Sequence, residues 1–176
     1  MGPWRTLLFA AAVAAVPCAP AVAAPTDTAV KAAFLPRFAR YVTWPAAAMP
    51  KGSDPFILCL VGGDPFGAAL DDAVRSQSID GRRIIVRRMD SAVGADRCQI
   101  AFVPGDKFQS PGQIMAALGR RPVLTVTDAN AGPQRGMIHF SVVDGRVRFF
   151  IDQASAARNG LTISSRLLAL AIGVKQ

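Results

Sequence analysis

Three polar side chains stand together near the carboxyl end of the chain, at the start of an apolar run. Ser164, Ser165 and Arg166 lie in GLTISSRLLALA, residues 160–171. Two hydroxyls and a guanidinium at this place could hold an anion, line the entrance of an active site or cap a helix. A helix is expected because apolar residues recur at helical spacing: Ile163, Leu167, Leu170 and Ala171. We therefore predict a helix cap at Ser164 or Ser165, and an anion site stays compatible with it.

His139 is the only histidine. It alternates with Ser141 along a predicted strand, on the face opposite the apolar residues, and this pattern favours an exposed position. A Ser-His-Asp triad is not indicated, because no nucleophile-elbow sequence is present. One histidine and scattered cysteines also make a poor zinc set. We expect no catalytic residue, no metal and no cofactor, so the sequence does not favour an enzyme.

Glycines follow a predicted strand in GGDPFG, residues 62–67, where nucleotide-binding loops lie. Their spacing is not the G-x-G-x-x-G of dinucleotide-binding proteins, and the next strand ends in Arg87 and Arg88 rather than in an acidic ribose ligand. The segment indicates a tight turn into a helix.

The first 23 residues resemble a secretory signal peptide. A single basic residue, Arg5, precedes the apolar segment TLLFAAAVAAVP, and the small residues Ala21–Ala23 form a cleavage site. We expect cleavage after Ala23 and an exported protein without a membrane anchor. Pro17 fits poorly with the alternative, a lipoprotein anchored through Cys18.

Composition limits the classes of partner. The chain has a formal net charge of +8, and removal of Arg5 with the leader leaves +7. In an exported protein this charge does not favour nucleic acid, whereas acidic protein surfaces or anionic lipid heads stay plausible. Residues 24–176 contain no linker or repeat, and the chain is 51 % hydrophobic, so we predict one domain with a real core.

The elements that must position these residues alternate along the chain. We predict an α/β fold with a mixed central sheet flanked by helices, then a β-hairpin followed by short helices. The hairpin is clearest, because Asp144-Gly145 separates two alternating runs. Pro36 should kink or divide the first helix. The expected helices lie near residues 26–45, 64–76, 112–121 and 152–160, and the expected strands near 56–62, 82–89, 98–104 and 122–128.

Cys59 and Cys98 remain after the leader is removed. Two cysteines in an oxidising compartment usually pair, and the alternative is two buried thiols that never meet.

Segments along nearly the whole mature chain together resemble the YfiR-like family of periplasmic regulators. The segments that carry the resemblance are KAAFLPRFARYVTWP, LCLVGGDPFGAAL, GRRIIVRRM, CQIAFVP, PVLTVTD and RVRFFIDQASAARNGLTISSRLLALA. The resemblance implies that Cys59 and Cys98 match a family cysteine pair and form a disulfide.

The resemblance implies a regulator rather than an enzyme. Such proteins bind the periplasmic sensory domain of an inner-membrane diguanylate cyclase and hold it inactive, which lowers cyclic-di-GMP signalling and biofilm formation. An OmpA-like outer-membrane lipoprotein can sequester the regulator. The oligomeric state stays open, including a homodimer.

Exposed apolar and basic residues are the candidates for a partner surface. We expect Tyr41, Trp44, Arg146 and Arg148 to contribute to it. The alternative function is a periplasmic module that binds a small ligand and reports to another membrane receptor, such as a sensor kinase. A pocket lined by Arg146, Arg148 and His139 would favour that alternative.

Overall fold

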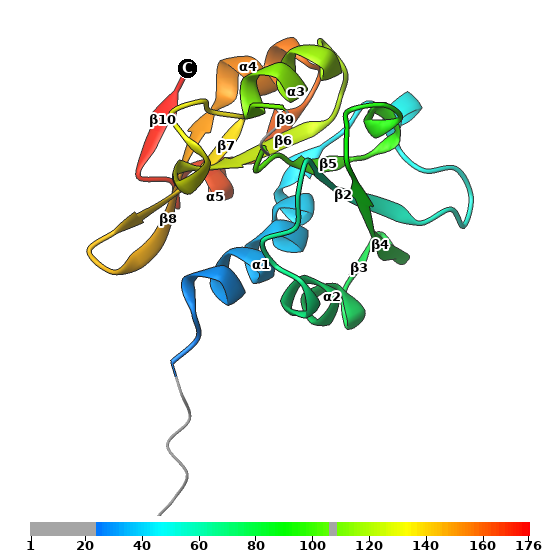
Figure 1. Ribbon diagram of the computed structural model, residues 1–176. Coiled ribbons are helices and arrows are strands. Elements are labelled where there is room, and N and C mark those ends of the chain that lie inside the picture. Colours follow the sequence, from blue (N-terminus) through cyan, green and yellow to red (C-terminus); the bar gives the residue numbers. More distant parts are fainter. Residues whose placement is uncertain (1–23, 106–108) are drawn as a thin grey trace, which may run out of the picture.

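The structure is a computed structural model that describes residues 24–105 and 109–176 (Figure 1). The predicted leader, residues 1–23, lies outside the described residues. Within them, the fold is the predicted mixed α/β fold, and the large sheet has the strand order β10-β8-β7-β6-β5-β2-β4-β3. These strands are Phe56–Val61 (β2), Ser78–Ile79 (β3), Arg82–Met89 (β4), Ile100–Phe102 (β5), Leu124–Asp128 (β6), Ile138–Val143 (β7), Arg146–Asp152 (β8) and Gly173–Lys175 (β10).

The five central strands of the sheet run in parallel, and antiparallel pairing occurs toward both edges. Strands β4, β2, β5, β6 and β7 run parallel, because helices and loops cross between them. Strand β8 returns antiparallel to β7, and β10 then adds to β8 in parallel. The edge strand β3 is antiparallel to β4. A separate two-stranded ladder joins Val42–Thr43 (β1) to Thr162–Ile163 (β9).

The hairpin between β7 and β8 has the predicted turn. Asp144 and Gly145 both have positive φ, at 50° and 66°, which a two-residue turn of type I′ requires. The alternation along β8 is also as expected. Phe149 and Ile151 face the core, whereas Arg146 and Arg148 are exposed.

The first helix, α1, spans Asp27–Phe38, and the hydroxyl of Thr26 caps it by accepting the amide of Ala29. Pro36 lies inside α1 rather than dividing it. The helix ends two residues later and passes into the 3-10 turn η1, Ala39–Tyr41. Pro36 thus lies in the last turn of α1, where the hydrogen bond that a proline removes is one of the final bonds of the helix.

Two layers of helices enclose the sheet. Figure 1 shows α1 and Ala68–Arg75 (α2) on one side and Pro111–Leu118 (α3) on the other. Side chains of β2 pack alternately against the two helix layers, because successive side chains of a strand point to opposite faces. Leu58 and Leu60 join the core under α1 and α2, while Cys59 and Val61 join a smaller core under α3.

The predicted disulfide joins Cys59 and Cys98, whose Cα atoms lie 6.0 Å apart. Cys59 is in the middle of β2 and Cys98 lies two residues before β5. The bond therefore links two neighbouring strands inside the core under α3.

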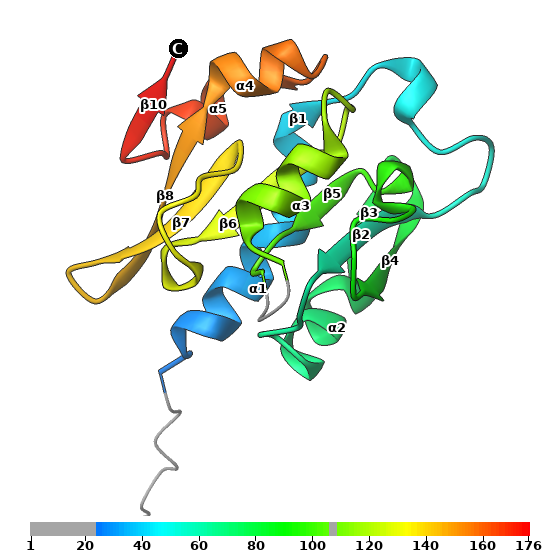
Figure 2. The same ribbon diagram turned by 45° about the horizontal axis from the view of Figure 1, so that its top comes forward.

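The carboxyl-terminal part differs most from the prediction. Asp152 caps the short helix Gln153–Arg158 (α4) as expected, with its carboxylate accepting the amide of Ser155. The next helix, Ser165–Leu168 (α5), is only one turn long. The predicted continuation through Leu170 and Ala171 is wrong, because the chain turns and adds β10 to the edge of the sheet (Figure 2).

Candidate functional site

The serines at the start of α5 do not form the predicted hydroxyl cap. Ser164 occupies the N-cap position, and its carbonyl accepts the amides of Leu167 and Leu168. Its side chain makes no capping hydrogen bond, and its Oγ is buried without a partner among the described residues. Ser165 is the first exposed residue of the turn. The expected capping bond is therefore wrong, and a single helical turn offers no anion site.

The aromatic candidates for a partner surface separate into one buried and one half-buried residue. Trp44 is only 7 % exposed, and its indole Nε1 donates to the carbonyl of Gln99 at 3.1 Å. Its ring stacks edge-on against Phe56 in the core. The expectation that Trp44 is an exposed aromatic residue is therefore wrong, because most of its ring belongs to the core. Tyr41 is half-buried and packs against the main core.

His139 is buried, at 4 % exposure, and not the exposed strand residue that its spacing predicts. Its Nδ1 lies 2.8 Å from the hydroxyl of Thr127, the residue beside it on β6. His139 and Ser141 do lie on the face opposite Ile138 and Phe140, but His139 is buried on that face as well. Arg135 and Gly136 in the loop before β7, and Phe150 beside it on β8, lie near His139.

A groove lies on the face of the sheet that carries His139, at the edge formed by the late strands β7, β8 and β10. It has a volume of about 410 Å³. The residues that line it come from the loop before β7 and from three adjacent strands: Arg135, Gly136, His139, Phe150, Ile151, Asp152, Gly173, Val174 and Lys175. Arg146 and Arg148, which were expected beside His139, are exposed but do not line the groove.

Strand register explains why these residues meet. Thr127, His139, Phe150 and Gly173 are successive Cα partners across β6, β7, β8 and β10. Two residues along, Lys175 is the partner of Asp152 and forms an ion pair with it, at 3.2 Å. Residues two apart on a strand share a face, so both rows belong to the same side of the sheet.

Glycine is needed at position 173 because the ring of Phe150 lies against it. A Cβ there would stand 2.9 Å from Cδ1 of that ring. The guanidinium carbon of Arg135 covers the same ring at 4.6 Å from its centroid. Phe150 therefore forms a half-buried floor with a cation stacked on it.

The surroundings of His139 favour the neutral form of its ring. Burial lowers the pKa of His139, and the nearby charge of Arg135 lowers it further, although Asp128 opposes the change. The hydroxyl of Thr127 accepts the amide of Gly136 at 2.8 Å, which leaves its own hydrogen available for Nδ1 of His139. We assign the remaining ring proton to Nε2, which makes that nitrogen a hydrogen-bond donor.

A second buried polar pair lies on the other side of the sheet. Nζ of Lys31 in α1 is 2.6 Å from Oδ2 of Asp128 at the end of β6, and both side chains are almost fully buried. The other oxygen of Asp128 accepts the amide of Asn130. No local pattern could reveal this pair, because its members are far apart in the sequence.

The GGDPFG segment is used structurally, as its spacing indicates. Asp64 accepts the amides of Phe66 and Gly67 and an Nε–H of Arg88. Burial raises the pKa of Asp64, but these hydrogen bonds outweigh it and lower the pKa below its ordinary value. Hydrogen bonds to Asp71 and Asp64 raise the pKa of Arg88. The segment thus fastens the start of α2 to β4.

The described part of the chain holds no group of three or more metal-ligating side chains. Among the same residues, no helix is long and apolar enough to cross a membrane.

The comparison with known families decides the assignment. The model of the YfiR/HmsC-like family matches residues 28–172, nearly the whole described chain. The chain belongs to the YfiR/HmsC-like family. A search of curated proteins finds no match. Membership supports a periplasmic regulator of the YfiR/HmsC class, a class that is regulatory rather than catalytic.

Proposed function

We propose that this YfiR/HmsC-like protein represses an inner-membrane diguanylate cyclase by binding its periplasmic sensory domain. Residues 1–23 serve as the export leader, and residues 24–176 form the periplasmic domain. Binding lowers cyclic-di-GMP and biofilm formation, and an OmpA-like outer-membrane lipoprotein relieves the repression by sequestering the protein. The family assignment supports this function, and no catalytic or cofactor role is proposed.

An exposed apolar stretch between α5 and β10 carries the proposal. Leu170 is 61 % exposed and Ile172 is 43 % exposed, although most large apolar side chains of the described residues are buried. The backbone of Ile172 is fixed by a hydrogen bond to the carbonyl of Phe149, so this stretch is held at the edge of the sheet. Ordered, exposed apolar side chains are typical anchors of a protein interface.

Basic side chains beside the hairpin turn suit an acidic partner. Arg146 and Arg148 are exposed and share one face of β8. Half-buried Tyr41 is fixed close to α5, because its carbonyl accepts the amide of Ser164. We propose that the arginines assist the encounter and that Leu170 and Ile172 provide the lasting contact.

Binding to the purified periplasmic domain of the cyclase tests the contact. Leu170→Asp and Ile172→Asp should each weaken binding about tenfold or more, mainly through faster dissociation. Val93→Asp is the matched control, because Val93 is 84 % exposed in a loop outside the proposed surface. Equal affinities for all three variants would contradict the proposed surface.

A genetic experiment tests the function itself. Deletion of the gene should raise cyclic-di-GMP and surface attachment, and the effect should vanish in a strain that also lacks the cyclase. An unchanged cyclic-di-GMP level in the single deletion would contradict the repressor function.

The groove lined by His139 supports a second candidate function, a small-ligand module that reports to another membrane receptor. A cavity of about 410 Å³ falls in the range of small-molecule sites. Unchanged cyclic-di-GMP in the deletion, together with tight binding of a solute by the purified protein, would favour this candidate.

A further inference from the structure

The groove on β7, β8 and β10 combines three features that separate it from an ordinary surface hollow. It contains a buried polar side chain, His139, with one ring nitrogen held by Thr127. It is lined by two cationic side chains, Arg135 and Lys175. It also offers an aromatic surface, the half-buried ring of Phe150.

The hydrogen-bonding groups of the groove are mostly donors. The guanidinium of Arg135, the ammonium of Lys175 and Nε2–H of neutral His139 all donate. The single carboxylate is Asp152, and both of its oxygens are engaged, one by the amide of Ser155 and the other by Lys175. A ligand must therefore supply acceptors.

The charges of the lining residues favour a ligand with a single negative charge. Arg135 and Lys175 contribute two positive charges, Asp152 contributes one negative charge, and His139 is neutral. A phosphate monoester carries nearly two negative charges and would lie beside the carboxylate of Asp152. A carboxylate carries one charge, and its planar shape matches the fork of an arginine.

The rest of the lining suits an apolar body. The half-buried ring of Phe150 contributes apolar surface beside the charged groups, whereas the side chains of Ile151 and Val174 belong to the opposite face of the sheet. Small-molecule sites typically combine such surface with a few polar groups that fix orientation.

We propose that this groove binds a small organic carboxylate. Its carboxylate group is held by Arg135, with support from His139 and Lys175, and its apolar body lies against Phe150. The site is separate from the proposed partner surface at Leu170 and Ile172, so the proposal does not depend on the repressor function.

Titration with sodium benzoate, followed by NMR on protein purified from the periplasm after expression of the full-length gene, tests the site. Benzoate should bind saturably, and benzamide, its uncharged counterpart, should bind at least about tenfold more weakly. Arg135→Met should weaken benzoate binding about tenfold or more, since one charge-assisted contact is lost. Lys175→Met should weaken it less, because Lys175 is exposed and shared with Asp152.

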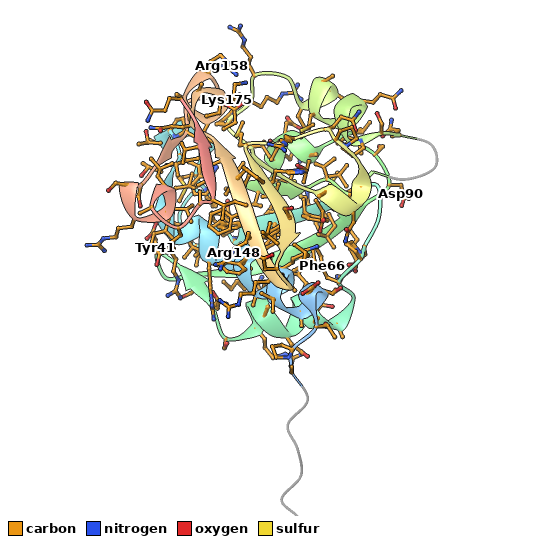
Figure 3. The ribbon with its side chains drawn as sticks, turned by 90° about the vertical axis from the view of Figure 1, so that its left-hand side faces the viewer. Tyr41, Phe66, Asp90, Arg148, Arg158 and Lys175 are labelled. Carbon is orange, nitrogen blue, oxygen red and sulfur yellow. A yellow bond between two sulfur atoms is a disulfide. The ribbon has the colours of Figure 1, made fainter. Side chains whose placement is uncertain are left out.

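Arg148→Met is the matched control, because it removes the same charge from an exposed residue of β8 that does not line the groove. Figure 3 shows Lys175 at the end of β10 and Arg148 well along the hairpin from it. Benzoate affinity should be unchanged in Arg148→Met. Folding of each variant is checked by its thermal unfolding.

Several results would overturn the proposal. These are no saturable binding of benzoate, equal binding of benzamide, or equal losses in Arg135→Met and Arg148→Met. Inorganic phosphate that binds as tightly as benzoate would also overturn it, because the site would then recognise an anion without an apolar body. Failure here leaves the cyclase experiments unaffected, since those depend on Leu170 and Ile172.

Discussion

Among the described residues, the buried hydroxyl of Ser164 has no hydrogen-bond partner, whereas the hydroxyl of Ser110 caps a helix. The hydroxyl of Ser110 accepts the amide of Gln113, and the side chain of Gln113 accepts the amide of Ser110 in return. Both serines precede a helix, and their backbone conformations are nearly equal. The difference lies in where the side chain is directed, which sequence spacing does not reveal.

Alanine substitution should therefore separate the two serines. Ser110→Ala should lower the free energy of unfolding by about 1 kcal/mol, because a capping bond is lost. Ser164→Ala should change it by less than about 0.5 kcal/mol or raise it, because an unpaired buried hydroxyl is removed. Urea denaturation measures both. A loss of about 1 kcal/mol in Ser164→Ala would indicate that its hydroxyl does cap α5.

At the scale of elements, α1 and β6 are joined by the buried ion pair of Lys31 and Asp128. An ion pair removed from water gives little net stability by itself, but breaking it leaves an unpaired buried charge. The pair thus matters more for where α1 lies on the sheet than for the total stability of the fold.

Lys31→Met or Asp128→Asn should each lower the free energy of unfolding by about 3–5 kcal/mol. The double variant should lose less than the sum, because neither charge is then left unpaired. Arg75→Met is the control, since its ion pair with Asp72 is highly exposed and should contribute about 0.5 kcal/mol or less. Additive losses in the urea-denaturation cycle would contradict the coupling of the pair.

The disulfide joins two adjacent elements and should act mainly on stability. Cys59 and Cys98 are separated by 39 residues, and a closed loop of this size contributes about 4 kcal/mol in the chain-entropy model. The Cys59→Ser/Cys98→Ser variant should therefore unfold at a lower urea concentration, yet bind its partner when folded. Unchanged thermal stability on reduction, with loss of partner binding, would instead identify a redox switch.

Elements with strong local signals could be predicted from the sequence. Asp144-Gly145 defined the hairpin, and the apolar run around Cys59 defined β2, because turn chemistry and hydrophobic patterning act locally. β10 could not be predicted, because Leu170 and Ala171 continue a helical spacing and Gly173–Lys175 is short. That strand exists through its pairing with β8, a tertiary effect that overrides the local pattern.

The candidate site could be predicted only in part. The cysteine pair and the basic character of Arg146 and Arg148 were visible in the sequence. The groove was not, because register across four strands brings His139 and Phe150 together with Gly173. Trp44 had no signal to distinguish an exposed aromatic residue from a buried one.

At the scale of the whole molecule, positive charge dominates. The chain carries a formal net charge of +8, which becomes +7 if residues 1–23 are removed with Arg5. Charge of this size affects long-range encounter more than it affects the fold.

Added salt should slow association with an acidic partner more than it speeds dissociation. Screening shortens the Debye length from about 10 Å at 0.1 M to about 3 Å at 1 M, while apolar contacts at Leu170 persist. Stopped-flow or biosensor measurements over this range provide both rate constants. An association rate that does not respond to salt would contradict electrostatic steering.

The aromatic cluster of the core joins the first helix to the hairpin in the carboxyl-terminal part of the chain. Phe34 and Phe38 of α1 contact the rings of Phe140 and Phe149 in the hairpin, with centroids 5.3–6.2 Å apart. A polypeptide that emerges from its amino terminus thus delivers α1 long before the strands against which it packs. Phe34 and Phe38 lack these aromatic partners until residue 149 has been synthesised, so this part of the core closes late, and until then the unpaired apolar rings favour aggregation.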